Sequence, residues 1–254
     1  MSLAARARAI AGTSAPDRAR RTWSQARLFG GVVLGMWAVM FWFLFLSGRV
    51  YLYLSTRTAW VVPVGAVLLT LAAVGWLAAS RVSAAEYLRR REAVVLTLMV
   101  LPVIVVLVLP AATLGTFSAA KKTRFSAVNL RTFYGEITST SEITLLSVAA
   151  GQTSDAGSEA LAKRAGSDVD FVGFVTRYPD TPADELLLTR YVITCCVADA
   201  TITQVRVVNV PPGQFEPNDW IEVKGQIYPL GREVIVNATS VAGVPRPAKP
   251  YLTP

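Results

Sequence analysis

Histidine is absent from the 254-residue chain, and cysteine occurs only twice. The absence of histidine excludes every mechanism that needs an imidazole as a base, a proton shuttle or a metal ligand. Charged residues make up only 17% of the chain, whereas hydrophobic residues make up 53%. An average soluble domain is roughly a quarter charged. This composition excludes a chain that is disordered throughout and favours a protein that is partly embedded in lipid.

Basic residues are concentrated in the first half of the chain. Residues 1–117 contain twelve Lys or Arg and three Asp or Glu, whereas residues 118–254 contain thirteen and fourteen. The net charge of +8 is therefore the sum of +9 in the first half and −1 in the second. A nucleic-acid-binding protein would carry its positive charge on the folded reading surface. We therefore expect no nucleic-acid partner, and we interpret the basic residues as a signal of membrane topology.

Three long apolar runs contain no charged side chain. They are Leu28–Gly48, Thr58–Ser80 and Ala93–Ala120, which are 21, 23 and 28 residues long. A helix needs about 20 residues to cross the roughly 30 Å of hydrocarbon in a bilayer. The runs therefore predict a transmembrane domain over residues 28–117, surrounded by membrane lipid, with spans at about 28–48, 58–80 and 93–117.

The distribution of arginine predicts how these spans are oriented. The N-terminal arm, residues 1–27, has six arginines, and the connection between the second and third spans has four. The first connection has two, and four Lys or Arg follow the third span. Because cytoplasmic loops carry the excess of basic residues, the arm and the second connection are expected inside. We therefore predict a multi-pass protein of the cell inner membrane, with a disordered cytoplasmic arm and an extracytoplasmic C-terminal half.

The second half of the chain has the pattern of a small β domain. After a predicted stalk or linker at 118–167, five runs are rich in β-branched and aromatic residues and are bounded by Pro, Gly, Asn or Asp. Five strands in about 75 residues suit a closed barrel, because closure removes exposed edges. We predict an OB-like β-barrel over residues 168–254, with a small sandwich as the alternative. The expected strands are Val169–Arg177, Leu186–Cys196, Thr203–Val210, Trp220–Tyr228 and Glu233–Val241.

The two cysteines, Cys195 and Cys196, are adjacent and close to Asp199. On a strand, neighbouring side chains point to opposite faces, so we expect the two thiols to diverge. Three interpretations are open. The pair forms a vicinal disulfide, or Cys195, Cys196 and Asp199 bind a soft divalent metal, or one cysteine simply packs in the barrel. A closed zinc site would need a fourth ligand. We recognise no nucleophile–base pair and no phosphate-binding loop, so we predict no catalytic residues and no enzyme.

Four motifs follow the apolar half in a characteristic order. They are Phe171–Val175 (FVGFV), Cys195–Ala200 (CCVADA), Asp219–Gly225 (DWIEVKG) and Pro250–Leu252 (PYL). In this order the chain resembles the YcgQ-like family, whose members are described as subunits of a two-component permease. The resemblance implies a membrane protein that accompanies a larger multi-span permease subunit.

Two hypotheses for the function follow. In the first, the protein is an accessory subunit of a permease, and its extracytoplasmic barrel binds a solute or metal or braces the permease. The predicted spans support an accessory role, because a substrate pathway usually needs ionisable groups at membrane depth and these spans contain none. In the alternative, the protein is a membrane-anchored extracytoplasmic thiol-redox or metal-binding protein that uses the Cys195–Cys196 pair.

Overall fold

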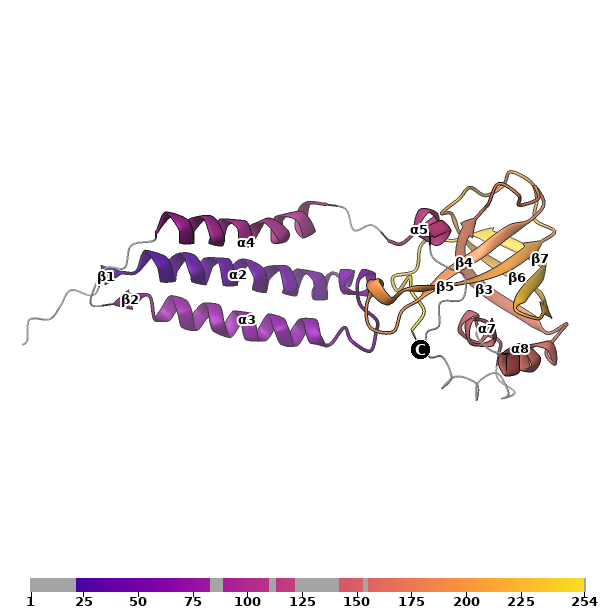
Figure 1. Ribbon diagram of the computed structural model, residues 1–254, viewed down its shortest axis with the longest axis horizontal. Helices are drawn as coiled ribbons and strands as arrows, with labels where there is room; N and C mark the ends of the chain where they lie inside the picture. Colours follow the sequence, from indigo (N-terminus) through magenta and orange to yellow (C-terminus); the bar gives the residue numbers. More distant parts are fainter. Residues whose placement is uncertain (1–21, 83–88, 110–112, 122–141, 153–154, 254) are drawn as a thin grey trace, which may run out of the picture. The chain divides into compact units, whose positions relative to one another are not determined.

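The computed structural model describes residues 22–82, 89–109, 113–121, 142–152 and 155–253 (Figure 1). Most of the predicted basic arm and much of the predicted stalk lie outside these residues. The described part of the chain divides into two units. The first comprises the described residues within Met1–Met40 and Gly65–Val108, and the second those within Phe41–Val64 and Leu109–Pro254.

Three long helices carry the apolar runs of the first half. They are α2 (Gln25–Leu46), α3 (Val61–Ala78) and α4 (Arg90–Val108), with 22, 18 and 19 residues. Each is long and apolar enough to cross a membrane, which indicates a multi-pass membrane protein. The third helix ends nine residues before the predicted end at 117. It stops just before Leu109-Pro110, where the proline ring disfavours a helical conformation of the preceding residue.

Within the first unit, the helices pack through small residues and a few polar contacts. Gly31 of α2 lies against α3, and a Cβ atom at this position would be 2.7 Å from the side chain of Leu77. The Trp37 indole donates a 3.1 Å hydrogen bond to the carbonyl oxygen of Met99 and so links α2 to α4. At one end of these helices, β1 (Thr22–Trp23) pairs with β2 (Arg81–Val82) in a two-residue antiparallel ladder.

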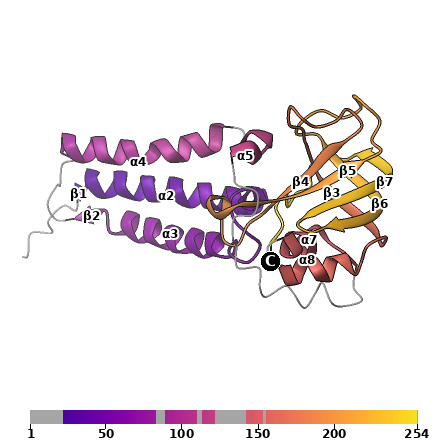
Figure 2. The ribbon, with the colours of Figure 1, turned by 45° about the vertical axis from the view of Figure 1, so that its right-hand side comes forward.

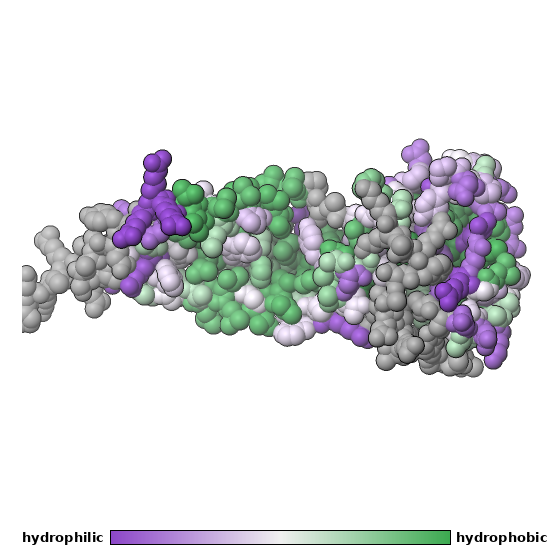
Figure 3. Space-filling view, viewed as in Figure 1, coloured by the Kyte–Doolittle hydropathy of each residue, from purple (hydrophilic) through white to green (hydrophobic). Residues whose placement is uncertain are grey.

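The outer faces of these helices are apolar. Leu68 and Leu71 of α3 are 61% and 64% exposed, and Leu98 of α4 is 67% exposed. Figure 3 shows this apolar surface as a nearly continuous band over the helices. A band of this kind is costly in water and favourable in hydrocarbon, as expected for membrane-spanning helices.

The second unit contains a closed five-stranded barrel, as predicted. Its strands are β3 (Asp168–Thr176), β4 (Leu186–Val192), β5 (Thr201–Val208), β6 (Trp220–Leu230) and β7 (Glu233–Gly243). The order around the barrel is β3-β4-β5-β7-β6, with β6 pairing back to β3. Only the β5–β7 pair among these strands is parallel. This is the topology of an OB-fold barrel, and it confirms the fold class predicted from the sequence.

The barrel core consists of inward-facing aliphatic side chains from all five strands. Val205, Ile221, Ile227 and Val236 are completely buried, and they alternate with more exposed residues along their strands. Strand β6 has a bulge between Lys224 and Gly225, where it pairs with β7. A Cβ atom at Gly225 would clash with the backbone of Asn237 on β7, so this position requires glycine.

Two short helices complete this core. They are α7 (Leu145–Gln152) and α8 (Asp155–Ala162), which lie side by side next to the barrel (Figure 2). Val148 of α7 and Leu161 of α8 are fully buried in the same hydrophobic cluster as the barrel strands. Both helices fall within residues 118–167, the range predicted as a stalk. The folded core of the second unit therefore begins before residue 168.

Further short elements connect these parts of the second unit. They are the 3₁₀ helices η1 (Arg49–Leu52) and η3 (Val197–Asp199) and the helix α5 (Thr116–Lys121). The first lies in the connection between α2 and α3, residues Ser47–Trp60, which we call the α2–α3 connection. The second lies between β4 and β5, in a segment that contains both cysteines.

Candidate functional site

Both cysteines lie in a turn between β4 and β5. We call residues Ile193–Ala200 the cysteine loop. Strand β4 ends at Val192, four residues before the predicted end at Cys196. Cys196 has an extended backbone (φ −154°, ψ 170°) and caps the 3₁₀ helix η3. The chain therefore turns immediately after the cysteine pair instead of continuing as a strand.

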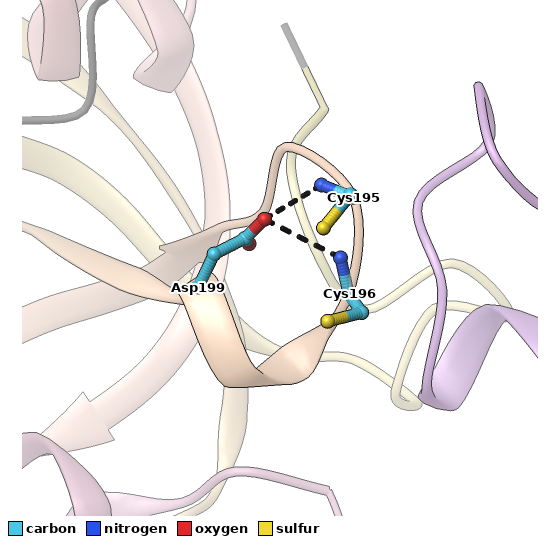
Figure 4. Close-up of side chains that lie close together, drawn as sticks. All are labelled: Cys195, Cys196 and Asp199. Carbon is cyan, nitrogen blue, oxygen red and sulfur yellow. Dashed lines mark hydrogen bonds between the residues drawn. The ribbon is translucent and has the colours of Figure 1, made fainter.

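Asp199 organises this turn through hydrogen bonds to backbone N–H groups (Figure 4). Its Oδ1 atom accepts a 3.0 Å hydrogen bond from the N–H of Thr194. Its Oδ2 atom accepts hydrogen bonds from the N–H groups of Cys195 at 2.7 Å and Cys196 at 3.4 Å. In return, the backbone N–H of Asp199 donates a 3.1 Å hydrogen bond to the carbonyl oxygen of Cys196, and the two residues have the arrangement of a capping box. The carboxylate is thus fixed on the same side of the loop as the thiols.

The two sulfur atoms and a carboxylate oxygen of Asp199 all lie within 4.8 Å of one another. The expectation that the thiols diverge is therefore wrong, because the alternation of a strand does not extend to these residues. Both cysteines are free thiols, and Cys195 is exposed whereas Cys196 and Asp199 are half-buried. The cluster is thus assembled and reachable from solvent.

The thiol of Cys195 and the carboxylate of Asp199 shift each other's pKa. The hydrogen bond to Asp199 is the main cause that raises the pKa of Cys195 to about 11, and the neighbouring Cys196 adds to the effect. Partial burial alone would raise the pKa of Asp199. The hydrogen bonds from the Cys195 thiol and from the backbone N–H groups of the loop outweigh it and lower that pKa below 3.8. At neutral pH the carboxylate of Asp199 is therefore ionised, and the thiol of Cys195 next to it is protonated.

The α2–α3 connection forms backbone hydrogen bonds with the cysteine loop. Leu54 forms an isolated antiparallel bridge with Cys196, and the N–H of Val197 donates to the carbonyl oxygen of Tyr53 at 2.9 Å. The carbonyl oxygen of Cys195 accepts two hydrogen bonds, from the N–H of Ser55 at 3.1 Å and from the hydroxyl of Thr58 at 2.6 Å. Thr58 lies only three residues before the first residue of α3.

The C-terminal tail is also hydrogen-bonded to the cysteine loop, to β4 and to the α2–α3 connection. Leu252 accepts a 2.9 Å hydrogen bond from the N–H of Ile193 and donates one of 2.8 Å to the carbonyl oxygen of Tyr191. In addition, the hydroxyls of Thr56 and Thr253 are 2.9 Å apart and hydrogen-bonded. The α2–α3 connection, the cysteine loop and the tail thus form one hydrogen-bonded layer within the second unit.

The segment before α5 is also attached to the barrel. The hydroxyl of Tyr191 donates a 2.9 Å hydrogen bond to the carbonyl oxygen of Gly115, and the N–H of Leu114 donates to the hydroxyl of Tyr251 at 3.2 Å. Burial raises the pKa of Tyr191 above its ordinary value, so it stays protonated as a donor. The ring of Tyr191 stacks on Phe174 and meets the ring of Tyr251 edge to face, in a buried aromatic cluster near the end of β4.

The three ligand residues predicted from the sequence, Cys195, Cys196 and Asp199, are therefore brought together. The structure adds Tyr53, Ser55 and Thr58, which hold the backbone of the loop. No short motif marks these three residues. They are separated from the cysteines by about 140 positions, and their role depends on a tertiary contact that only the fold reveals.

Part of the chain matches a known protein family. Residues 132–254 match the family described as the DUF1980 C-terminal domain. The match covers the barrel with α7 and α8, and it fits a DUF1980/YcgQ-like family. No curated protein matches the chain.

Proposed function

We propose that this protein, which has a DUF1980 C-terminal domain, is the accessory subunit of a membrane permease and that its barrel captures a soft divalent metal such as Zn²⁺ outside the cytoplasm. The observation that carries the proposal is the position of the cysteine loop. Its metal-binding side chains belong to the barrel, whereas its backbone is hydrogen-bonded to residues that lead directly into α3. A metal held there is close to a helix end and can pass to a partner in the membrane.

The ligand set suits a soft or borderline divalent ion. Thiolate and carboxylate ligands bind Zn²⁺ at about 2.3 Å and 2.0–2.2 Å, so ligand atoms around one ion are roughly 3.3–3.8 Å apart. The present separations of up to 4.8 Å require only a small contraction of an exposed turn. Three protein ligands leave one position open, and an open position favours release to a partner over permanent structural binding.

The properties of Cys195 favour metal capture over thiol-redox chemistry. Reactive redox thiols have lowered pKa values, because the thiolate is the nucleophile. The carboxylate of Asp199 has the opposite effect on Cys195 and keeps it protonated at neutral pH. A bound cation would displace that proton and would be attracted by the ionised carboxylate.

The helices support an accessory role. The described parts of the three apolar runs contain no ionisable side chain at membrane depth, and a polar pathway usually needs one. The larger partner, implied by the resemblance to the YcgQ-like family, would supply that pathway. The arginine distribution supports the proposed orientation, with the barrel on the extracytoplasmic side.

Metal binding is tested with the full chain, purified in detergent, reduced and stripped with a chelator. Titration with Co²⁺ should give thiolate-to-cobalt charge-transfer absorption, and Zn²⁺ should abolish it by competition. The Cys195→Ser, Cys196→Ser double variant should show neither, whereas Asp184→Asn, a change elsewhere on the barrel, should behave like the wild type. Absence of the charge-transfer band in the folded wild-type protein would overturn the metal assignment.

The accessory role and the orientation are tested in cells. Mild-detergent purification of the tagged chain should recover a multi-span permease in stoichiometric amount. A membrane-impermeant maleimide should label Cys195 in intact spheroplasts, since this thiol is exposed. Purification of the chain without such a partner across several mild detergents would argue against the accessory role. Labelling only after membrane rupture would place the barrel on the cytoplasmic side.

A further inference from the structure

The first unit contains an apolar groove at the arginine-rich end of the three helices. Its volume is about 380 Å³, and it is open at the protein surface. The lining residues come from all three helices and are Ala26, Gly30, Trp76, Arg91, Glu92, Val95 and Leu96. The wall is almost entirely apolar except for the first turn of α4. Water gains few hydrogen bonds in such a groove, so a hydrocarbon chain occupies it more favourably.

A glycine allows the groove to take this shape. A Cβ atom at Gly30 would be 2.9 Å from Nε1 of Trp76, so glycine permits the indole ring to lie directly against α2. Trp76 remains 50% exposed and forms part of the wall. An exposed indole on an apolar wall is typical of contact with lipid near the headgroup layer.

The polar end of the groove is strongly basic. Arg91 lines it, and it is directly preceded in the chain by Arg89 and by Arg90, the first residue of α4. Glu92 is the one acidic residue of the lining, and its carboxylate accepts a 3.1 Å hydrogen bond from the N–H of Arg89. Glu92 therefore caps the helix, and positive charge predominates around it. An apolar groove with arginines at one end matches an acyl chain that ends in a phosphate.

We propose that this groove binds one anionic phospholipid, with an acyl chain between α2, α3 and α4 and the phosphate at Arg91. Arginine suits this role because its planar guanidinium binds phosphate oxygens in a bidentate manner. A phospholipid with a neutral headgroup binds more weakly, because its own ammonium group offsets the phosphate. The site is independent of the metal proposed at the cysteine loop, and either proposal can fail without the other.

The test uses the full chain, purified in mild detergent, delipidated and titrated with phosphatidylglycerol or phosphatidylcholine. Native mass spectrometry counts the bound lipids. The first phosphatidylglycerol should bind about tenfold more tightly than phosphatidylcholine, and Arg91→Gln should remove most of this preference. Arg57→Gln, a change in the α2–α3 connection, is the matched control and should leave it unchanged. The proposal would be overturned if the wild type bound the two lipids equally tightly, or if Arg91→Gln and Arg57→Gln had the same preference for phosphatidylglycerol. Either result would indicate only an unspecific lipid shell.

A second variant tests the acyl chain separately from the phosphate. Leu96→Trp fills the groove and leaves Arg91 in place, so it should abolish the tight phosphatidylglycerol adduct while the protein stays folded by circular dichroism. Retention of that adduct would place the lipid elsewhere and overturn the proposal. It would likewise be overturned if the delipidated chain forms dimers whose cross-links map to Leu96, because a helix of a second copy would then occupy the groove.

Discussion

The hydroxyl of Thr58 donates a 2.6 Å hydrogen bond to the carbonyl oxygen of Cys195, although the two residues are 137 positions apart in the chain. Thr58 belongs to the connection that leads into α3, and Cys195 belongs to the barrel. Any change in the cysteine loop on metal binding must therefore alter, or be opposed by, the contacts of the α2–α3 connection. By linkage, a change in that connection must also alter the affinity of the loop for its metal.

Replacing Thr58 with valine should weaken metal binding. Valine has nearly the same shape but cannot donate, so the carbonyl oxygen of Cys195 keeps only the hydrogen bond from the N–H of Ser55. One hydrogen bond of this kind contributes about 1 kcal/mol, which corresponds to a loss of affinity of roughly fivefold. Competition of the purified chain with a zinc indicator measures this loss.

Thr56→Val is the control for this change. Its hydroxyl lies in the same connection but bonds to Thr253 and not to the cysteine loop. It should leave the zinc affinity near the wild-type value and lower thermal stability less than Thr58→Val, because the hydroxyl of Thr58 also hydrogen-bonds to Ser55. If both variants bind zinc equally well, the Thr58–Cys195 contact does not position the site.

The metal affinity should increase with pH, and this increase should continue up to an unusually high pH. Cys195 has a pKa of about 11, so below this pH binding must release its proton, and each released proton contributes about a tenfold gain in affinity per pH unit. Asp199 contributes no such dependence at neutral pH, because its lowered pKa keeps it ionised. For an ordinary thiol the rise would level off near 9.0, whereas here it should continue beyond this value.

Zinc titrations across this range measure the slope, and Cys195→Ser supplies the control. The serine variant should lose the part of the slope that belongs to the Cys195 proton. A wild-type affinity that stays constant between about pH 6 and pH 9 would exclude coordination by the thiol.

The sequence allowed the barrel and the helices to be predicted because their signals are local. Runs without charge define the helices, and β-branched runs between Pro and Gly define the strands. The end of β4 was harder to predict. Ile193 and Thr194 are residue types that favour strands. The carboxylate of Asp199, however, accepts hydrogen bonds from the N–H groups of Thr194 and Cys195 and so stabilises a turn. A side chain that competes for backbone donors in this way overrides propensity.

The arrangement around the site could be predicted only in part. The spacing of Cys195, Cys196 and Asp199 identified them as candidate ligands before their geometry was known. Their convergence depends on the turn, and the contacts of Ser55 and Thr58 depend on the whole fold. The sequence also did not predict that α7 packs into the barrel core, because this segment is short and its small residues resemble those of a linker.

Truncation of Leu161 should destabilise the barrel. This side chain is completely buried and packs against Gly151 of the neighbouring helix, within the core cluster that also contains the strands. Leu161→Ala should lower the free energy of unfolding by about 2–5 kcal/mol. Urea unfolding of the full chain, followed by circular dichroism in the β region, measures this change. Leu230→Ala, at a residue that is 62% exposed, is the control and should change stability by less than about 0.5 kcal/mol. Equal effects would mean that α8 does not belong to the folded core.

Replacement of Asp199 with asparagine should make Cys195 more reactive and the metal site weaker. The carboxylate is the largest cause of the raised pKa of Cys195, and asparagine removes its negative charge. The pKa of the thiol should therefore fall towards 9.0, which increases the thiolate fraction at neutral pH. In a Cys196→Ser background, which leaves Cys195 as the single thiol, alkylation by iodoacetamide should accelerate several-fold.

Asp199→Asn should thus have two opposite effects, a faster alkylation of Cys195 and a weaker binding of zinc. With both cysteines present, Asp199→Asn should lower zinc affinity at least about tenfold, because one ligand loses its charge. Asp184→Asn is a change of the same type elsewhere on the barrel, and it should alter neither the zinc affinity nor the alkylation rate of Cys195. If alkylation of Cys195 is as slow in the Asp199 variant as in its parent, the carboxylate does not control the thiol. The proposed exchange of a proton for a metal ion at this pair would then have no basis.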